Sequence, residues 1–219
     1  MRNAEKDEFE MEQRRQAMLY EGFKLFAQNG IEFVTMQQVA DACKVGIATL
    51  YRYYNNKLAL VLAVATRQWQ DYTEYVKITR KKNNTDLMTA AQELEFYLGF
   101  YIDLYKNHKD ILKFNLSFNS YVINEGVTKE ELAPYLESIS VIGRLFHEVY
   151  EKGKRDGTLR TDLTEDKMFA TTSHIMMAVG VRYAQGLLFA SENEADRSEE
   201  YELLKKMILR EFVIAESEE

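Results

Sequence analysis

The chain has 219 residues, of which 46% are hydrophobic and 29% are charged, and its formal net charge is −7. Its single cysteine, Cys43, excludes an internal disulfide and a multi-cysteine zinc site, which fits a reducing cytosol. The hydrophobic fraction suffices for a buried core, and one proline in a chain rich in Leu, Glu, Lys, Ala and Met favours helix throughout. We therefore predict an all-α globular protein.

The N-terminus lacks the features of an exported or membrane protein. Residues 1–12 hold no apolar stretch that would serve as a signal peptide. The longest apolar run nearby, Leu58–Ala65, is too short to span a bilayer. We expect a cytoplasmic protein without a membrane partner.

The charge is distributed unevenly along the chain. Residues 1–12 carry two basic and five acidic groups, or −3, and residues 13–67 carry seven Lys or Arg against three acids, or +4. The remaining −8 falls on residues 68–219. A basic module thus precedes an acidic body, and positive charge is what phosphate binding requires.

The basic module opens with a predicted helix over residues 12–28. Leu19, Phe23 and Phe26 recur there at helical spacing and give the helix a buried face. Gly30 follows Asn29 and supplies a left-handed cap. The first helix is therefore expected to end at this pair.

The next segment reads as two short helices joined by a tight turn. Thr35 and Gln38 have the spacing of a capping box, which satisfies open backbone groups at a helix start. Apolar residues recur at helical spacing over residues 36–43 and again over 47–54. Lys44–Gly46 interrupts the pattern, so we predict a helix-turn-helix.

A long fourth helix follows, for which Asn56 is the expected N-cap. Its apolar stripe extends from Leu58 to Val76, and residues 81–87 form a polar break. Beyond the break we predict five helices, at 86–106, 109–123, 130–155, 165–190 and 196–216.

The last two predicted helices are apolar over more of their surface than one buried face requires. Burial within the monomer and a two-fold interface between identical chains both account for this pattern, and we favour the homodimer. The expected dimer interface comprises Ile175, Val179, Tyr183, Leu187, Tyr201, Leu204, Ile208 and Phe212.

Residues 13–67 resemble the DNA-binding domain of TetR-family transcriptional regulators. The residues that carry the resemblance are Leu25, Phe26, Gly30, Thr35, Val39, Ala40, Val45, Thr49, Leu50, Tyr51, Tyr53, Tyr54, Lys57 and Leu60. The resemblance implies a three-helix DNA-binding domain at 13–56, behind an acidic extension at 1–12, and a helical ligand-binding and dimerisation domain at 57–219. It also implies a regulator, usually a repressor that leaves a near-palindromic operator when a small organic ligand binds.

The turn departs from the family's pattern. The family usually has Ala-Gly-Val-Ser where this chain has Cys43, Lys44, Val45 and Gly46. If the position of Lys44 needs a positive φ, the lysine costs on the order of 1 kcal/mol of strain. Gly46 gives up a serine cap, and Ala48 replaces a frequent glycine.

A recognition helix places small or polar side chains on base edges while flanking groups hold phosphates. Ile47 and Ala48 are expected to contact thymine methyl groups, and Thr49 a base or a phosphate. The other expected DNA contacts are Lys44, Gly46, Tyr51, Arg52, Tyr53 and Lys57, with Thr35 added by similarity to the family. We expect Leu50 and Tyr54 to face the core instead.

The acidic body is rich in aromatic residues, most of which ordinary core packing explains. A cavity between helices lined with aromatic and methionine side chains is the usual form of an apolar ligand site. We therefore expect an organic effector that is at least partly apolar. The expected pocket comprises Trp69, Tyr72, Phe100, Tyr101, Phe114, Phe118, Tyr121, His147, His174 and Met177.

An enzyme and a protein-binding adaptor are the alternatives. His108, His147 and His174 form no recognised metal motif, and no glycine-rich phosphate loop or nucleophile elbow occurs, so we expect no catalysis, metal or cofactor. An all-helical dimeric adaptor or ligand-binding protein without DNA binding would leave residues 35–57 without a role. We therefore predict a DNA-binding regulator whose partners are double-stranded operator DNA, a second copy of the chain and an effector.

Overall fold

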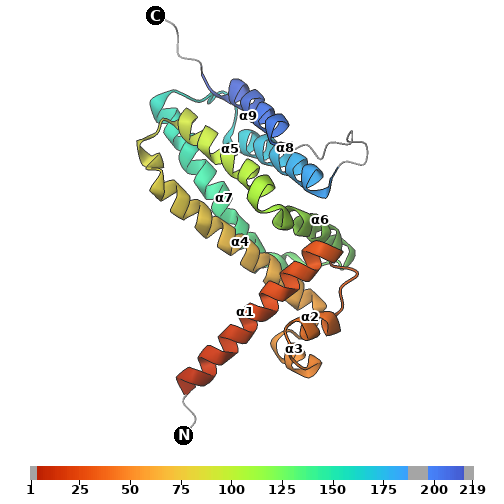
Figure 1. Cartoon of the computed structure of the whole chain (residues 1–219). Helices are drawn as coiled ribbons and strands as arrows, with labels where there is room; N and C mark the ends of the chain where they lie inside the picture. Colours follow the sequence, from red (N-terminus) through yellow and green to blue (C-terminus); the bar gives the residue numbers. More distant parts are fainter. Residues whose placement is uncertain (1–3, 187–196, 215–219) are drawn as a thin grey trace, which may run out of the picture. The chain divides into compact units, whose positions relative to one another are not determined.

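A computed structural model describes residues 4–186 and 197–214 (Figure 1). These residues are helical apart from turns and one isolated β-bridge between Leu159 and Val213, which confirms the all-α prediction. A short 3₁₀ turn, η1, covers Thr85–Leu87. The α-helices are α1 Ala4–Asn29, α2 Met36–Ala42, α3 Ile47–Tyr53, α4 Lys57–Lys82, α5 Ala90–Asn107, α6 Lys109–Asn124, α7 Lys129–Asp156, α8 Glu165–Gln185 and α9 Ser198–Phe212.

The predicted helices are present within the described residues, and the largest difference there is the start of α1. This helix begins at Ala4, so residues predicted as an acidic extension form its first turns. Positions 187–190, 196 and 215–216 of the last two predicted helices lie outside the described residues. No helix among the described residues combines the length and apolar character that crossing a bilayer requires. The chain forms two compact units. Unit 1 comprises the residues up to Asp71 and the segment Lys113–Ser138. Unit 2 comprises Tyr72–Leu112 and the residues from Ile139 on.

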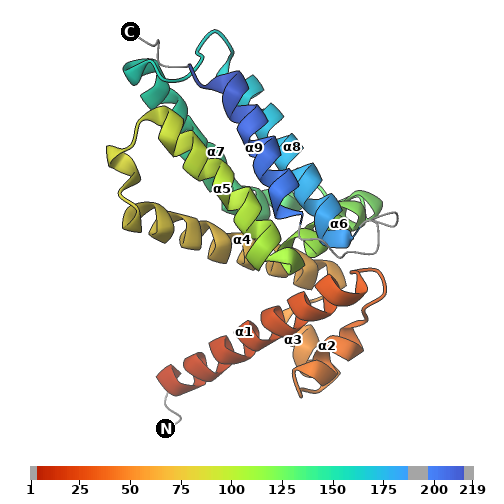
Figure 2. The same ribbon diagram turned by 45° about the horizontal axis from the view of Figure 1, so that its top comes forward.

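The core of unit 1 joins the helix-turn-helix to the helices around it. α1 packs on α2, and α2 on α3 (Figures 1 and 2). Phe26 of α1, Leu50 of α3 and Leu60 of α4 are almost fully buried in one cluster. Each such side chain stabilises the fold by roughly 1.5–3 kcal/mol relative to exposure. Seven-residue helices such as α2 and α3 depend on this burial, because helices of that length are marginal alone.

Unit 2 is built around α5, which packs against both α8 and α9 (Figure 2). Tyr201 of α9 is only 1% exposed, and its hydroxyl donates to the carbonyl of Met176 on α8. A Cβ at Gly180 would lie 2.9 Å from the Tyr201 hydroxyl oxygen. Glycine at this position therefore allows α9 to approach α8.

The structure corrects part of the predicted dimer interface. Tyr201, Ile208 and Phe212 are buried within unit 2, so they are core residues of a single chain. Val179, Tyr183 and Leu204 are half-buried, and Leu187 lies outside the described residues. The large apolar side chains that α8 and α9 expose are Ile175, Leu203 and Met207. An apolar helix pattern does not by itself show which face its own chain covers, which is why the predicted interface included residues that are buried in the single chain.

A buried carboxylate links three helices of unit 2. Glu93 of α5 is 3% exposed and accepts hydrogen bonds from Arg80 of α4 and, at 2.7 Å, from Lys152 Nζ of α7. Arg80 Nη1 also donates to Glu148 at 3.1 Å, and Lys152 Nζ to the Thr85 carbonyl at 3.1 Å. One acid thus satisfies two cations that are themselves mostly shielded from solvent.

We predict that Glu93→Gln lowers the free energy of unfolding by about 3 kcal/mol or more, because it leaves Lys152 without its countercharge and Arg80 with only the exposed Glu148. The control is Glu148→Gln, which removes an exposed partner of the same guanidinium and should cost less than about 1 kcal/mol. Urea denaturation followed by circular dichroism measures both. Equal losses would show that the buried charge has no special role.

Candidate nucleic-acid interface

The helix-turn-helix begins at Thr35, which caps α2 with both halves of the predicted capping box. The Gln38 backbone N–H donates to Thr35 Oγ1 at 3.2 Å, and the Thr35 N–H donates to Gln38 Oε1 at 2.7 Å. Met36, Val39 and Ala40 turn the opposite face of α2 into the core. The cap therefore fixes where α2 starts and keeps Thr35 at the surface.

The turn between α2 and α3 depends on a left-handed residue. The Val45 N–H donates to the Ala40 carbonyl at 3.0 Å, and the Lys44 N–H donates to the Asp41 carbonyl at 3.0 Å. This pair of bonds is the Schellman motif, in which the residue after the C-cap has positive φ. Lys44 has φ 55°, which confirms that a lysine occupies a position suited to glycine.

α3 starts from a glycine that offers no side-chain cap. Gly46 is its N-cap, and only the glycine carbonyl is used, accepting from the Thr49 N–H at 2.8 Å. Leu50 is fully buried and Tyr54 is 6% exposed, so both face the core as predicted. Burial raises the pKa of Tyr54 to about 12, which keeps its phenol neutral.

Most of the predicted DNA contacts are accessible. Thr35, Lys44, Gly46, Ala48, Tyr51 and Arg52 are exposed, and Ile47, Thr49, Tyr53 and Lys57 are half-buried. On α3, Arg52 Nη2 donates to Thr49 Oγ1 at 3.4 Å, so a hydroxyl and a guanidinium lie together on its surface. This surface combines the small, hydroxylated and cationic groups that base-edge and phosphate contacts use.

Lys57 differs from the other predicted phosphate contacts. Its Nζ donates to the Glu32 carbonyl at 3.2 Å and lies 5.5 Å from the centre of the Tyr121 ring. Desolvation lowers the pKa of Lys57. The side chain therefore helps to hold unit 1 together, and its contact with DNA stays a prediction.

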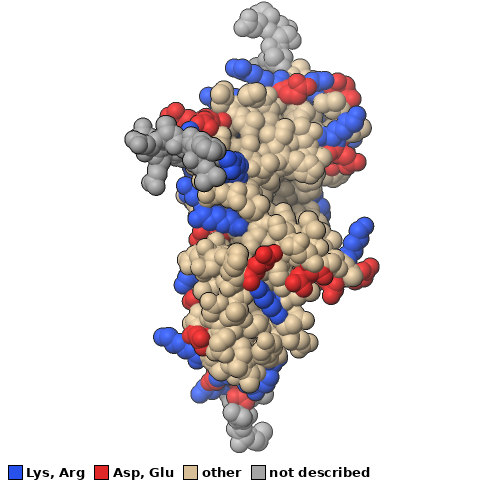
Figure 3. Space-filling model, turned by 90° about the vertical axis from the view of Figure 1, so that its right-hand side faces the viewer, with Lys and Arg blue, Asp and Glu red and all other residues tan. Residues whose placement is uncertain are grey.

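Charge counting along the sequence missed several ion pairs on α1. Arg14 pairs with Glu10 at 3.6 Å and Arg15 with Glu12 at 3.6 Å, so acids assigned to the extension neutralise cations of the basic module. The spacing of three or four residues was visible in the sequence and signals such pairs on a helix. On the face shown in Figure 3, Lys and Arg are likewise interspersed with Asp and Glu.

Lys44 and Arg52 lie in the helix-turn-helix, and neither forms an ion pair with any residue that the structure describes. Both side chains are exposed. These two cations are therefore available to bind phosphate without first breaking a contact with an acid.

The predicted pocket residues do not form one group. Phe114, Phe118 and Tyr121 belong to the core cluster of unit 1, where Phe114 and Phe118 stack at 5.8 Å between ring centres. These three side chains pack in that core, and a role for them in binding a ligand stays a prediction. Trp69, also in unit 1, is 5% exposed.

The other predicted pocket residues belong to unit 2. Tyr72 and Phe100 are buried together, with the Tyr72 hydroxyl donating to the Phe100 carbonyl at 2.7 Å. Tyr101 is buried as well. Met177 is half-buried, whereas His147 and His174 are exposed on α7 and α8 and do not line a buried pocket.

Two clefts of the described chain are lined by other residues. One, of about 410 Å³, lies in unit 2 between α5 and α9 and is lined by Ala91, Gln92, Glu95, Leu209, Arg210 and Val213. The other, of about 440 Å³, lies in unit 1, where Leu19, Ala59, Leu62, Ala63 and Pro134 supply its apolar lining. Neither contains a predicted pocket residue.

Comparison with known proteins agrees with this geometry. The family described as bacterial regulatory proteins, tetR family, matches residues 19–64. The HTH-type transcriptional regulator SAB2452 of Staphylococcus aureus (strain bovine RF122 / ET3-1) is 29% identical over 98 residues, which cover 45% of this chain and 51% of the relative. The chain thus spans about half the length of the curated relatives it matches.

Solved structures share the fold over nearly the whole chain. A putative regulator from Saccharomonospora viridis in complex with choline has a TM-score of 0.70 at 16% identity, covering 94% of this chain and 100% of that one. FadR from Bacillus subtilis in complex with stearoyl-CoA has a TM-score of 0.66 at 11% identity, covering 89% and 97%.

The capped helix pair, its left-handed turn and the helical body define an all-helical protein with a helix-turn-helix. Within this fold, residues 19–64, which include α2 and α3, are similar to the tetR family of bacterial regulatory proteins.

We predict that Lys44→Gly raises the free energy of unfolding by up to about 1 kcal/mol, because glycine adopts positive φ without strain from a Cβ. Lys44→Ala is the matched control, since it removes the same charge but keeps a Cβ at φ 55°. Chemical denaturation of the two variants separates backbone strain from charge. A similar gain in both would assign the effect to the lysine charge instead.

Proposed function

We propose that the protein is a homodimeric repressor that reads a near-palindromic operator with α3 and leaves it when a small organic ligand binds. The observation that carries this proposal is the surface of α3 and of the turn before it. It holds the small side chain of Ala48, the hydroxyl of Thr49 and the cations Lys44 and Arg52, which form no ion pair with a described residue. Such a protein acts on the chromosome in the cytoplasm and requires no catalytic site.

The short recognition helix explains why dimerisation belongs to this proposal. α3 has seven residues, so one copy reaches few base edges and binds weakly. Two copies held by a two-fold axis read two half-sites about one or more helical turns apart, and their binding free energies reinforce one another. The operator is then expected to have matching two-fold symmetry.

We predict that Arg52→Ala weakens binding to all DNA sequences and lowers the slope of log affinity against log salt by about one per altered contact. Thr49→Val keeps the side-chain shape but removes the hydroxyl, so it should change the preference among operator variants. Lys82→Ala, at the exposed C-terminal end of α4, is a charge-matched control with no expected effect. Fluorescence anisotropy with DNA from the protein's own promoter measures all three.

Absence of binding by the wild-type protein at low salt would contradict the DNA-binding proposal. Equal losses in Arg52→Ala and Lys82→Ala would contradict the assignment to α3, since net charge alone would then explain them.

The proposed dimer surface uses the apolar side chains that α8 and α9 leave exposed. Leu203 and Met207 of α9 are each 58% exposed, and Ile175 of α8 is 38% exposed. Leu203 and Met207 are four residues apart and therefore share one face of α9. An exposed apolar face on a helix already packed in its own core is typical of an interface with another chain.

We predict that Met207→Glu converts the dimer to monomers, because it places a charge in an apolar interface. Leu87→Glu, in η1, is the matched control, since Leu87 is 88% exposed and lies outside α8 and α9. Size-exclusion chromatography with light scattering gives the molar mass of each. A dimer in Met207→Glu would place the interface elsewhere.

The proposed effector site lies in the aromatic core of unit 2. The Tyr101 hydroxyl donates to Ser173 Oγ at 3.0 Å and lies 3.2 Å from the Tyr97 hydroxyl. Thr172 is fully buried, and its hydroxyl has no hydrogen-bond partner among the described residues. A ligand that displaces apolar side chains here would meet polar groups that fix its orientation.

We predict that a partly apolar compound raises the melting temperature of the protein and weakens its operator binding, as a ligand that favours the DNA-free state requires. Thermal-shift screening followed by anisotropy with bound operator tests this. A ligand that stabilises the protein without changing operator affinity would contradict the proposed release. The fold does not identify the compound, because choline and stearoyl-CoA occur in structures of this same fold.

A further inference from the structure

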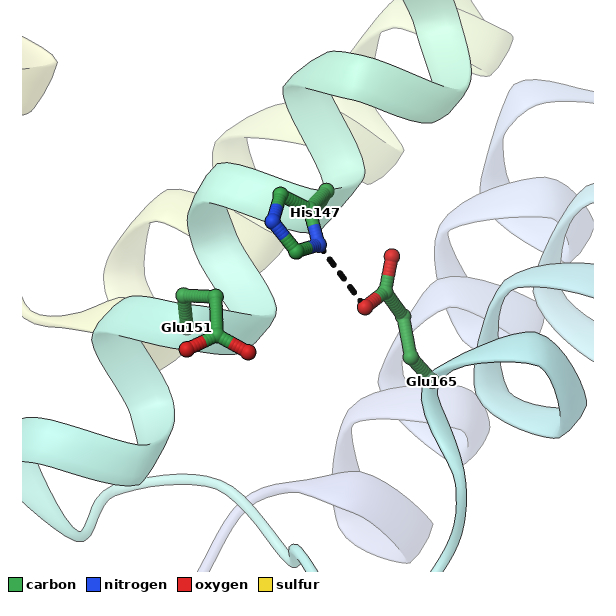
Figure 4. Close-up of side chains that lie close together, drawn as sticks. All are labelled: His147, Glu151 and Glu165. Carbon is green, nitrogen blue, oxygen red and sulfur yellow. Dashed lines mark hydrogen bonds and ion pairs between the residues drawn. The ribbon is translucent and has the colours of Figure 1, made fainter.

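Three potential metal ligands meet on one side of unit 2 (Figure 4). His147 and Glu151 lie four residues apart on α7, so they share one face of that helix. Glu165 is the first residue of α8, directly after the Thr164 cap. One ligand atom from each residue lies within 4.8 Å of the other two.

The spacing of these atoms is close to that around a small metal ion. His147 Nδ1 and Glu165 Oε2 are 2.9 Å apart. Two ligands bound at about 2.0–2.2 Å in a tetrahedral site lie roughly 3.3 Å apart. The pair therefore needs to open by only a few tenths of an ångström, and Glu151, on a flexible side chain, completes a set of three.

The cluster already favours positive charge. His147 Nδ1 is hydrogen-bonded to the Glu165 carboxylate, and Glu151 adds a second carboxylate within 4.8 Å. A divalent cation between these ligand atoms would interact with both acids at short range.

We propose that His147, Glu151 and Glu165 form a binding site for a divalent transition-metal ion of the zinc class. One imidazole nitrogen and two carboxylate oxygens form a ligand set that zinc accepts, whereas magnesium and calcium favour oxygen alone. Three protein ligands leave a fourth position for water. The side chains are 58%, 37% and 31% exposed in the order His147, Glu151, Glu165, so the ion exchanges with solvent.

Lys154 is the competitor for this ion. Its Nζ lies 2.5 Å from Glu151 Oε1 and 5.0 Å from the centre of the Tyr150 ring. Metal binding releases the ammonium group from Glu151, and the Tyr150 ring then remains as its partner. The bound ion joins α7 to the start of α8, so it restrains the connection between them independently of DNA.

The test is isothermal titration of the full chain with zinc chloride, with cobalt(II) absorption to report the coordination. We expect one ion per chain, and a loss of affinity of at least tenfold in His147→Ala. His174→Ala, which removes another exposed histidine of unit 2, should bind as the wild type does. Lys154→Ala should bind several-fold more tightly, because it removes the competing cation.

Three results would overturn the proposal. The first is the absence of zinc binding by the wild type, and the second is unchanged zinc binding in His147→Ala. The third is a cobalt spectrum with a thiolate charge-transfer band that is lost in Cys43→Ser. If circular dichroism shows that His147→Ala is misfolded, Glu151→Gln takes its place, with the same loss expected. Titration detects the ion directly, so failure here leaves the DNA-binding proposal standing, and failure of DNA binding leaves this one standing.

Discussion

The geometry of the helix-turn-helix depends on one backbone constraint, the left-handed conformation of Lys44. The two hydrogen bonds of the Schellman motif end α2 there and set the direction in which the chain enters α3. α3 is too short to be stable without support, and buried Leu50 anchors it from the other side. Lys44 therefore combines two effects, because it adds strain to the turn and an unpaired positive charge to the surface.

The helix-turn-helix was predictable from the sequence because its signals are local. Thr35 and Gln38 cap α2 through atoms three residues apart, and Asn56 caps α4 through a 2.8 Å bond from the Ala59 N–H. Such bonds form whatever the distant parts of the chain do. The start of α1 was missed because residues 4–12 are mostly charged and have no apolar stripe, although Glu10 and Glu12 pair with Arg14 and Arg15 one turn later.

The burial of the residues predicted for the ligand pocket and the dimer interface was harder to predict, because it depends on long-range packing. α9 has two apolar sides, and only the packing of α5 shows that Tyr201 is covered while Met207 is not. Phe114 and Phe118 were assigned to the body, yet they pack with α1 residues far away in the sequence. Hydrophobic periodicity finds the faces of a helix, but partners that follow much later in the chain decide which face is buried.

The net charge of a segment does not give the number of cations that are free of acidic partners on its surface. The basic module carries +4, but Arg14 and Arg15 are paired along α1 and Lys57 is engaged by Glu32 and Tyr121. Paired cations release fewer counterions on DNA, since their charge is already partly neutralised. Lys44 and Arg52 alone would give one copy of the module little electrostatic affinity for DNA. The proposed homodimer would supply a second copy of the module, and with it the additional contacts that tight binding requires.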